Sequence, residues 1–274
     1  MKNNTFGQYF PGNSLLHRMD PRMKLIITVL YIVMIFCAKN VLAFAFLLSL
    51  TIALALFSCI SLRVILRGIR PIVFIVLFTV FFNIFLTEGQ GEPLAAFWIL
   101  KVYKEGIVRA LLMALRVIIL ITGTGVLLTY TTSPIALADA IESLLGPLKK
   151  IHVPVHEFAM MMTIALRFIP TLIEETDRIM SAQKARGADF SNGSIARRVK
   201  ALIPILIPLF VSAFKRAEEL AVAMECRCYR GGEGRTKLHV LHYRFSDFVW
   251  LFLFVLFLAA VILINIWSPL KIAY

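Results

Sequence analysis

The sequence has few acidic residues and few cysteines, and each shortage excludes a class of protein. Only 16 of its 274 residues are Asp or Glu, whereas 29 are Lys or Arg, which gives a formal net charge of +13. The four cysteines have no regular spacing, so the chain is not a small secreted domain held together by disulfides. No phosphate-binding loop of the Walker type occurs, so any ATP must be hydrolysed by another chain.

The N-terminus also lacks the pattern of a secretory signal peptide. Residues through Asn13 are mostly polar, and no short apolar run there ends at a small-residue cleavage site. What dominates the sequence instead is hydrophobicity, since 59% of the residues are hydrophobic and the mean hydropathy is +0.83. Such a composition excludes an ordinary soluble domain and predicts an all-α, multi-pass membrane protein.

Five apolar segments predict about five membrane-spanning helices. They cover residues 25–38, which is short, and residues 41–60, 71–87, 106–130 and 248–267. Basic residues before the first segment and an unbalanced triplet after the second, Arg63, Arg67 and Arg70, must lie on the same side of the membrane. Positive charge collects on the cytoplasmic side. We therefore expect a multi-pass protein of the cell membrane. Its N-terminus would be cytoplasmic, and the loop at 88–105 and the tail at 268–274 would be external.

The sequence predicts three regions. Residues 1–130 contain the N-terminal lead-in and the first four spans, residues 131–246 form a middle region, and residues 247–274 contain the last span and its tail. This middle region holds 16 of the 29 basic and 11 of the 16 acidic residues, too many for a simple bundle of spans. A helix is expected to start at Thr132-Ser133-Pro134 and to end near Gly146-Pro147. Two long amphipathic helices follow, starting near Val155 and Ala196. We expect them at or below the membrane surface.

Each long helix ends in an arginine, Arg186 in the first and Arg227 in the second. Gly187 is a candidate for the left-handed residue that follows a helix C-terminus. A blander interpretation is that each arginine only complements the negative end of its helix dipole. In the second helix Ala213, Ala217 and Ala221 recur every four residues, which predicts a smooth stripe against which a neighbouring helix packs closely. Pro204 and Pro208 are expected to bend that helix.

Several blocks in order resemble the transmembrane T component of energy-coupling factor transporters, a family of vitamin and metal importers. The blocks cover residues 14–24, 165–170, 182–187 and 223–227. The two Ala-Arg-Gly signatures of that family correspond to Ala185-Arg186-Gly187, which matches in full, and to Cys226-Arg227-Cys228, which keeps only the arginine. That difference leaves the second helix end open, with Gly231-Gly232 as a later stop.

The resemblance implies a non-catalytic coupling subunit. Its helix ends would press into grooves of two cytoplasmic ABC ATPase subunits, alike or different, which bind the ATP and Mg²⁺. Its other surfaces would hold a membrane-embedded substrate-binding subunit, the S component. The chain itself would carry no cofactor and no metal, and it would bind lipid but no nucleic acid.

Other interpretations remain open from the residues alone. Glu174 and Glu175 superficially resemble the paired glutamates of an intramembrane hydrolase or protease, but no matching histidine motif follows. Acids and Arg178 that pair locally on the solvated half of a helix explain them adequately. Cys226 and Cys228, with His239 and His242, can be drawn as zinc ligands, but the spacing is not that of a usual zinc module. Arg116 lies within a predicted span, where it either takes part in transport or pairs inside the bundle. A self-sufficient secondary transporter is disfavoured because no inverted repeat is found.

Overall fold

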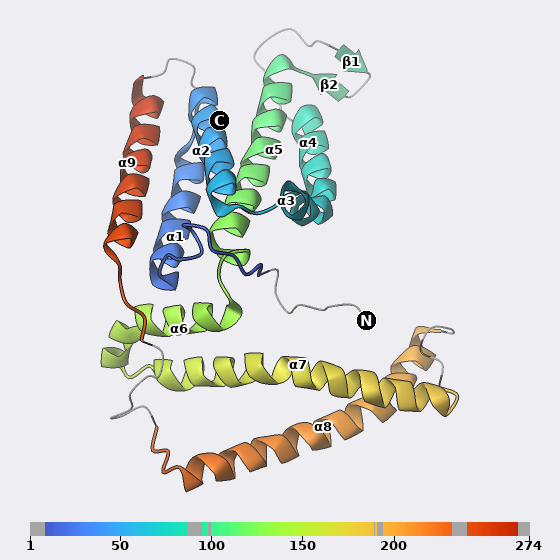
Figure 1. The fold of residues 1–274 in the computed structure, drawn as a ribbon. Coiled ribbons are helices and arrows are strands. Elements are labelled where there is room, and N and C mark those ends of the chain that lie inside the picture. Colours follow the sequence, from blue (N-terminus) through green and yellow to red (C-terminus); the bar gives the residue numbers. More distant parts are fainter. Residues whose placement is uncertain are drawn as a thin grey trace. The chain divides into compact units, whose positions relative to one another are not determined.

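The computed structural model describes residues 9–86, 95–97, 100–188, 190, 194–231 and 240–267 (Figure 1). These residues are helical apart from turns and one small hairpin, so the predicted all-α, multi-pass membrane fold is confirmed. The chain forms two compact units, residues 1–140 with 241–274 and residues 141–240. Residues 88–94 of the predicted external loop and the tail at 268–274 lie outside the described residues.

The first unit consists mainly of apolar helices that stand side by side (Figure 1). Its hairpin of β1 (Ala95–Phe97) and β2 (Leu100–Val102) is antiparallel, with Ala96 opposite Lys101, and it connects α4 to α5. The helices are α1 (Pro21–Cys37), α2 (Val41–Ser58), α3 (Leu62–Ile69), the 3₁₀ turn η1 (Arg70–Ile72), α4 (Val73–Leu86), α5 (Lys104–Thr124), the π-helical turn η2 (Gly125–Thr129) and α9 (Phe245–Trp267).

Four stretches of the described chain are long and apolar enough to cross a membrane. They are Leu62–Phe85, Gly106–Thr129, Val155–Ala185 and Phe245–Trp267, and the shorter Val41–Phe57 is also apolar. Val155–Ala185 is the first of the two long amphipathic helices, which we expected at or below the membrane surface because its C-terminal half is charged. By length and composition alone it also qualifies as a span.

Tyr31 joins three helices at the centre of the first unit. Its side chain is completely buried, its hydroxyl hydrogen-bonds to Thr51 Oγ1 in α2 at 2.7 Å, and it also donates to the Ile119 carbonyl in α5 at 3.1 Å. Gly123 of α5 lies so close to the Tyr31 ring that any side chain at this position would collide with it. The ring therefore fixes how near α1 and α5 approach each other.

The turn between α1 and α2 is held by polar side chains from α5 and α9. Arg116 Nη2 donates to the Ala38 carbonyl at 2.9 Å, and its guanidinium lies 5.2 Å from the centre of the Phe44 ring. Asn265 donates to the Cys37 carbonyl at 2.6 Å. Both carbonyls belong to the C-terminal end of α1, where helix carbonyls lack partners within the helix. This geometry supports the structural interpretation of Arg116, a charge paired inside the bundle.

A second polar cluster joins the N-terminal ends of α1 and α9. Asp247 is 0% exposed, and its two carboxylate oxygens accept the backbone N–H groups of Arg244 at 2.9 Å and Asp20 at 3.4 Å. The buried Lys24 ammonium donates to the Thr131 carbonyl at 2.9 Å and lies 3.3 Å from the Thr132 hydroxyl. The block at 14–24 that carries the family resemblance therefore has a structural role in joining distant segments.

The second unit contains two long helices, α7 (Val155–Ala185) and α8 (Ile195–Cys226), which lie alongside each other and run in opposite directions (Figure 1). They follow α6 (Pro134–Leu144), whose start lies in the first unit, and the 3₁₀ turn η3 (Gly146–Ile151). Ser133 Oγ accepts the Ala136 N–H at 3.3 Å, which confirms the predicted cap. The predicted helix starts at Val155 and near Ala196 are confirmed, whereas the bend expected at Pro204 and Pro208 stays a prediction.

Candidate functional site

The backbone after α7 closes in a Schellman motif. The Gly187 N–H donates to the Lys184 carbonyl at 3.0 Å, and the Ala188 N–H donates to the Gln183 carbonyl at 3.0 Å. Gly187 has φ +86°, which confirms that it is the left-handed residue of this helix end. Arg186 is the last residue before that turn. We call Ala185, Arg186 and Gly187 the first tip.

The end of α8 repeats the same motif without a glycine. The Cys228 N–H donates to the Glu225 carbonyl at 2.8 Å, and the Tyr229 N–H donates to the Met224 carbonyl at 3.0 Å. Cys228 occupies the left-handed position with φ +56°. The helix therefore ends at Cys226 and not at a later stop near Gly231. We call Cys226, Arg227 and Cys228 the second tip, since its arginine occupies the same position in the motif.

Replacing Cys228 with glycine is expected to stabilise the second tip. A residue with a Cβ in the left-handed region costs about 1–2 kcal/mol relative to glycine, so Cys228→Gly should recover part of that cost. The matched control is Cys226→Gly, which places the same residue inside the helix and should destabilise it by roughly 0.5–1 kcal/mol. Thermal unfolding of the purified chain measures both. Equal shifts of the same sign would contradict the left-handed geometry at Cys228.

Both tip arginines are exposed. Across the described residues, neither guanidinium makes a hydrogen bond or an ion pair with the rest of the chain. A planar guanidinium can make two parallel hydrogen bonds to a carboxylate, or it can bond to backbone carbonyls, in a geometry that lysine cannot reproduce. The two tips therefore present matching, exposed guanidinium groups.

The predicted alanine stripe is largely uncovered in this chain. Ala217 and Ala221 are exposed and Ala213 is half-buried. Close packing of a neighbouring helix on the stripe stays a prediction. The less exposed side of α8 instead carries larger residues at helical spacing, namely Ile205, Leu209, Ser212, Arg216, Leu220 and Met224.

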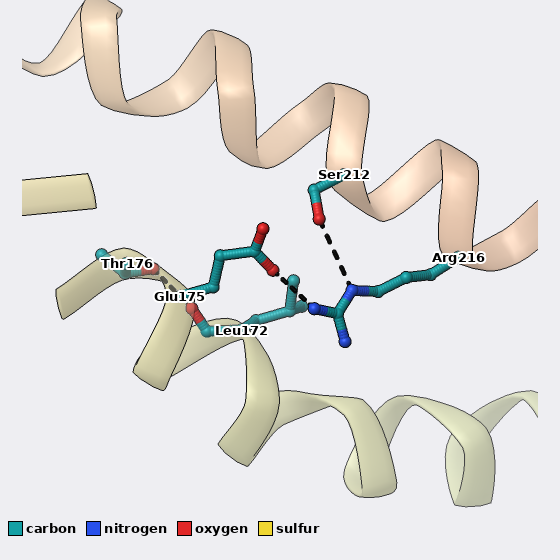
Figure 2. Close-up of polar contacts among 5 residues, drawn as sticks. All are labelled: Leu172, Glu175, Thr176, Ser212 and Arg216. Carbon is teal, nitrogen blue, oxygen red and sulfur yellow. Dashed lines mark hydrogen bonds and ion pairs between the residues drawn. The ribbon is translucent and has the colours of Figure 1, made fainter. Parts of the chain in front are cut away.

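An ion pair marks this side of α8 as the one that faces α7. Figure 2 shows Arg216 reaching from α8 to Glu175 of α7, with 2.8 Å between Arg216 Nη2 and Glu175 Oε2. Ser212, one turn earlier, lies 3.5 Å from Arg216 Nε. Alanine periodicity could not reveal this pair, because its partners are 41 positions apart. The signal in the sequence was the presence of opposite charges on the polar halves of both helices.

The same ion pair bears on the hydrolase interpretation. Glu175 is paired with Arg216, whereas Glu174 is exposed on another side of α7. General acid–base chemistry by two carboxylates needs both of them to face one reacting bond. The two glutamates thus do not form a catalytic pair in this structure. The sequence had predicted local pairing with residues such as Arg178, but the partner of Glu175 lies on the neighbouring helix.

The zinc interpretation gains no support from the described residues. Among them, no group of three or more His, Cys, Asp or Glu side chains is arranged to hold a metal ion. Cys226 and Cys228 are both exposed, and His239 lies outside the described residues.

A second surface of interest is a continuous row of exposed apolar side chains on α8. Phe210 is 65% exposed and packs against Phe214, with 4.6 Å between the ring centres. Monomeric soluble proteins rarely leave such a contiguous surface uncovered. We call this row the α8 apolar stripe, and it consists of Ile203, Leu206, Ile207, Phe210, Val211 and Phe214.

Comparison with known proteins gives one consistent result over most of the chain. The family described as "Cobalt transport protein" (CbiQ) matches residues 12–240. The relatives include proteins named energy-coupling factor transporter transmembrane protein EcfT from the three organisms named below. The relative from Clostridium kluyveri is 51% identical over 91% of this chain and 92% of its own length. Those from Lactococcus lactis subsp. cremoris and Bacillus subtilis are 47% and 51% identical, over 99% and 88% of this chain and 100% and 90% of their own lengths.

Proposed function

Because the chain belongs to the family of energy-coupling factor transporter transmembrane proteins, we propose that it transmits ATP-driven motion between other subunits of the transporter. Two cytoplasmic ABC ATPase subunits would bind ATP and Mg²⁺ and hydrolyse the ATP. A membrane-embedded S component would bind the vitamin or other micronutrient. The observation that carries this proposal is the matching geometry of the two tips, each with an exposed arginine whose guanidinium makes no hydrogen bond or ion pair with the described residues.

Each tip would insert into a groove on one ATPase subunit. Two equivalent tips suit a pair of ATPases, because each ATPase receives the same backbone turn and the same guanidinium. The arginines also lie at the negative ends of their helices, so their positive charge is favourable before any partner binds. Acidic side chains or backbone carbonyls in the groove would accept the guanidinium hydrogen bonds.

The α8 apolar stripe would contact the S component and the surrounding lipid. It lies in the middle of α8, before the charged end that leads to the second tip, so one helix has a polar end for an ATPase and an apolar part for a membrane partner. The N-terminal half of α7 has the same character, with Phe158, Met161 and Met162 exposed. A rigid helix that touches both kinds of partner can pass a displacement from one to the other.

Co-purification tests the proposal directly. The chain is expressed with the ATPase and S components of its own cell, extracted in mild detergent, and every bound polypeptide is identified. We expect two ATPase subunits and one S component per chain, together with ATP-dependent uptake after reconstitution into liposomes. Uptake by the chain alone, or cleavage of a lipidated peptide by the chain alone, would contradict the coupling role.

Labelling of single cysteines from either side of the membrane tests the expected topology. With the N-terminus in the cytoplasm, single cysteines placed at Gly89 or Gly91 of a cysteine-free chain should react with a membrane-impermeant reagent added outside the cell. A cysteine at Ser191 should react only after the cells are opened. These three positions lie outside the described residues. The reverse labelling pattern would place both tips outside the cell and overturn their role as ATPase contacts.

A further inference from the structure

Helix α3 is a short amphipathic helix at one end of the first unit. Figure 1 shows it nearly end-on beside the upright α4, so the chain changes direction at η1, where Pro71 lies. Ile65 is buried, and Gly68 lies against the hydroxyl of Tyr130 so closely that a Cβ would collide with it. One side of α3 is thus fixed against the residues that follow η2.

The opposite side of α3 combines two kinds of exposed residue. Leu62 and Leu66, one turn apart, are 68% and 56% exposed. Arg63, Arg67 and Arg70 are spaced four and then three residues apart, so they form one row next to the two leucines. All three arginines are exposed. A row of arginines beside a row of leucines is typical of a helix that lies in the membrane interface.

This row of arginines has no counter-charge in the chain around it. In the part of the chain that the structure describes, none of the three makes a hydrogen bond or an ion pair. The sequence contains no Asp or Glu between Asp20 and Glu88. Three neighbouring guanidinium groups repel one another, so an anionic partner from outside the chain would stabilise them.

We propose that α3 lies in the membrane interface and that Arg63, Arg67 and Arg70 bind the phosphate groups of anionic phospholipids. The three positive charges require an anionic partner. The position of α3 beside α4 indicates that this partner is a lipid. The helix leads through η1 into α4, whose surface is rich in exposed phenylalanine, so the arginines lie where a span meets the headgroup layer. Leu62 and Leu66 would enter the acyl region beside the headgroups that the arginines hold.

The location of α3 gives the bound lipid a structural consequence. Tyr130, which Gly68 contacts, directly precedes Thr131 and Thr132, whose oxygens accept hydrogen bonds from Lys24. Its carbonyl also accepts the Phe10 N–H at 3.0 Å. Lipids that hold α3 in place would therefore support the polar cluster that joins α1, η2 and α9. The proposed topology, with this segment on the cytoplasmic side, determines only which membrane leaflet supplies the lipid. The rest of the inference does not depend on it.

Retention of phosphatidylglycerol by the purified full-length chain tests the inference without any partner subunit. The chain is reconstituted in bilayers of phosphatidylcholine with increasing fractions of phosphatidylglycerol, extracted gently, and its bound lipids are quantified by native mass spectrometry. We expect selective retention of phosphatidylglycerol by the wild type. Each arginine near an anionic surface contributes about a fivefold effect, so Arg63→Gln with Arg67→Gln should weaken retention roughly 20- to 30-fold.

Two variants serve as matched controls. Lys149→Gln with Lys150→Gln removes the same number of exposed positive charges from η3 and should retain phosphatidylglycerol like the wild type. Arg63→Lys with Arg67→Lys keeps the charge, and with it the cytoplasmic placement of this segment, and should retain most of the lipid. Cysteine labelling at Ser191 checks that each variant keeps its topology.

Three results would overturn the inference. The wild type could retain phosphatidylcholine and phosphatidylglycerol equally, which needs no variant to observe. The double Gln variant of α3 could retain phosphatidylglycerol like the wild type. In a parallel purification together with the partner subunits, the same variant could lose a protein subunit while the isolated chain retains its lipid, which would show that an acidic protein surface covers α3. Lipid retention by the isolated chain is independent of ATPase coupling, so failure here leaves the proposed function standing.

Discussion

A chain that carries both Arg186→Ala and Arg227→Ala is expected to lose substrate uptake completely while part of the transporter complex is still recovered. The rest of each interface, including apolar surface of α7 and α8, should supply most of the affinity, because interface energy is concentrated in a few buried groups and area alone is a poor guide. The arginines would instead align each tip in its groove. Their loss should therefore separate ATP hydrolysis from movement of the helices.

Single substitutions at the tips distinguish charge from geometry. Each single alanine variant should impair uptake severely. Lysine should restore little if paired hydrogen bonds are needed, and much if any positive charge at a helix end is sufficient. Glutamate should be the most damaging replacement, because it is repelled by an acidic groove and opposes the helix dipole.

The measurement is substrate uptake alongside ATPase activity in reconstituted complexes of matched subunit composition. Arg178→Ala provides a control, since Arg178 is also an exposed arginine on the polar half of α7 but lies away from the tip. It should leave uptake close to the wild-type level. Wild-type uptake by the double alanine variant would remove both tips from the mechanism and leave them as ordinary helix ends.

Replacing Asp247 with asparagine is expected to destabilise the first unit by about 1–3 kcal/mol, the usual cost of leaving a buried polar group without its partner. Each carboxylate oxygen accepts one backbone N–H, from Arg244 at the start of α9 and from Asp20 at the start of α1. Asparagine has a single oxygen, so its amide group would face one of these donors. The isosteric change should therefore fail to preserve the cluster.

Thermal unfolding of the purified chain measures this loss, with an expected decrease in Tm of roughly 3–10 °C. Glu157→Gln is the matched control, because Glu157 also lies in the first turn of a helix but is exposed. Its neutralisation should change Tm by a degree or two at most. An Asp247→Asn chain as stable as the wild type would show that the hydrogen bonds at the start of α9 are dispensable.

Local signals in the sequence predicted most helices and both tip arginines. Apolar runs indicated the spans, and the Ser133-Pro134 cap and Gly187 indicated helix boundaries that the structure confirms. The second tip was harder, because Cys228 takes a conformation that usually indicates glycine. The carbonyls of Met224 and Glu225 determine that turn through the backbone, and a side-chain pattern carries little information about it.

Contacts between distant segments could not be predicted in the same way. Asp247 and Asp20 are 227 positions apart, and nothing in either local sequence specifies the other. The alanine stripe did not identify its own partner, because small residues permit close packing but do not specify which helix packs on them. Helix α3 was not predicted, and its arginines were noted only as an unbalanced triplet between two spans, since its eight residues are too few to show clear periodicity.

The α8 apolar stripe also has a consequence for how the cell keeps its subunits in proportion. A copy of the chain made without partners would present Phe210, Phe214 and their apolar neighbours without the protein surface proposed to cover them. Exposed apolar surface of this kind promotes aggregation and attracts chaperones and proteases. Surplus copies would then be removed until their number matches that of the partners. If the stripe is the partner surface proposed above, the same surface would mark an orphan subunit for degradation.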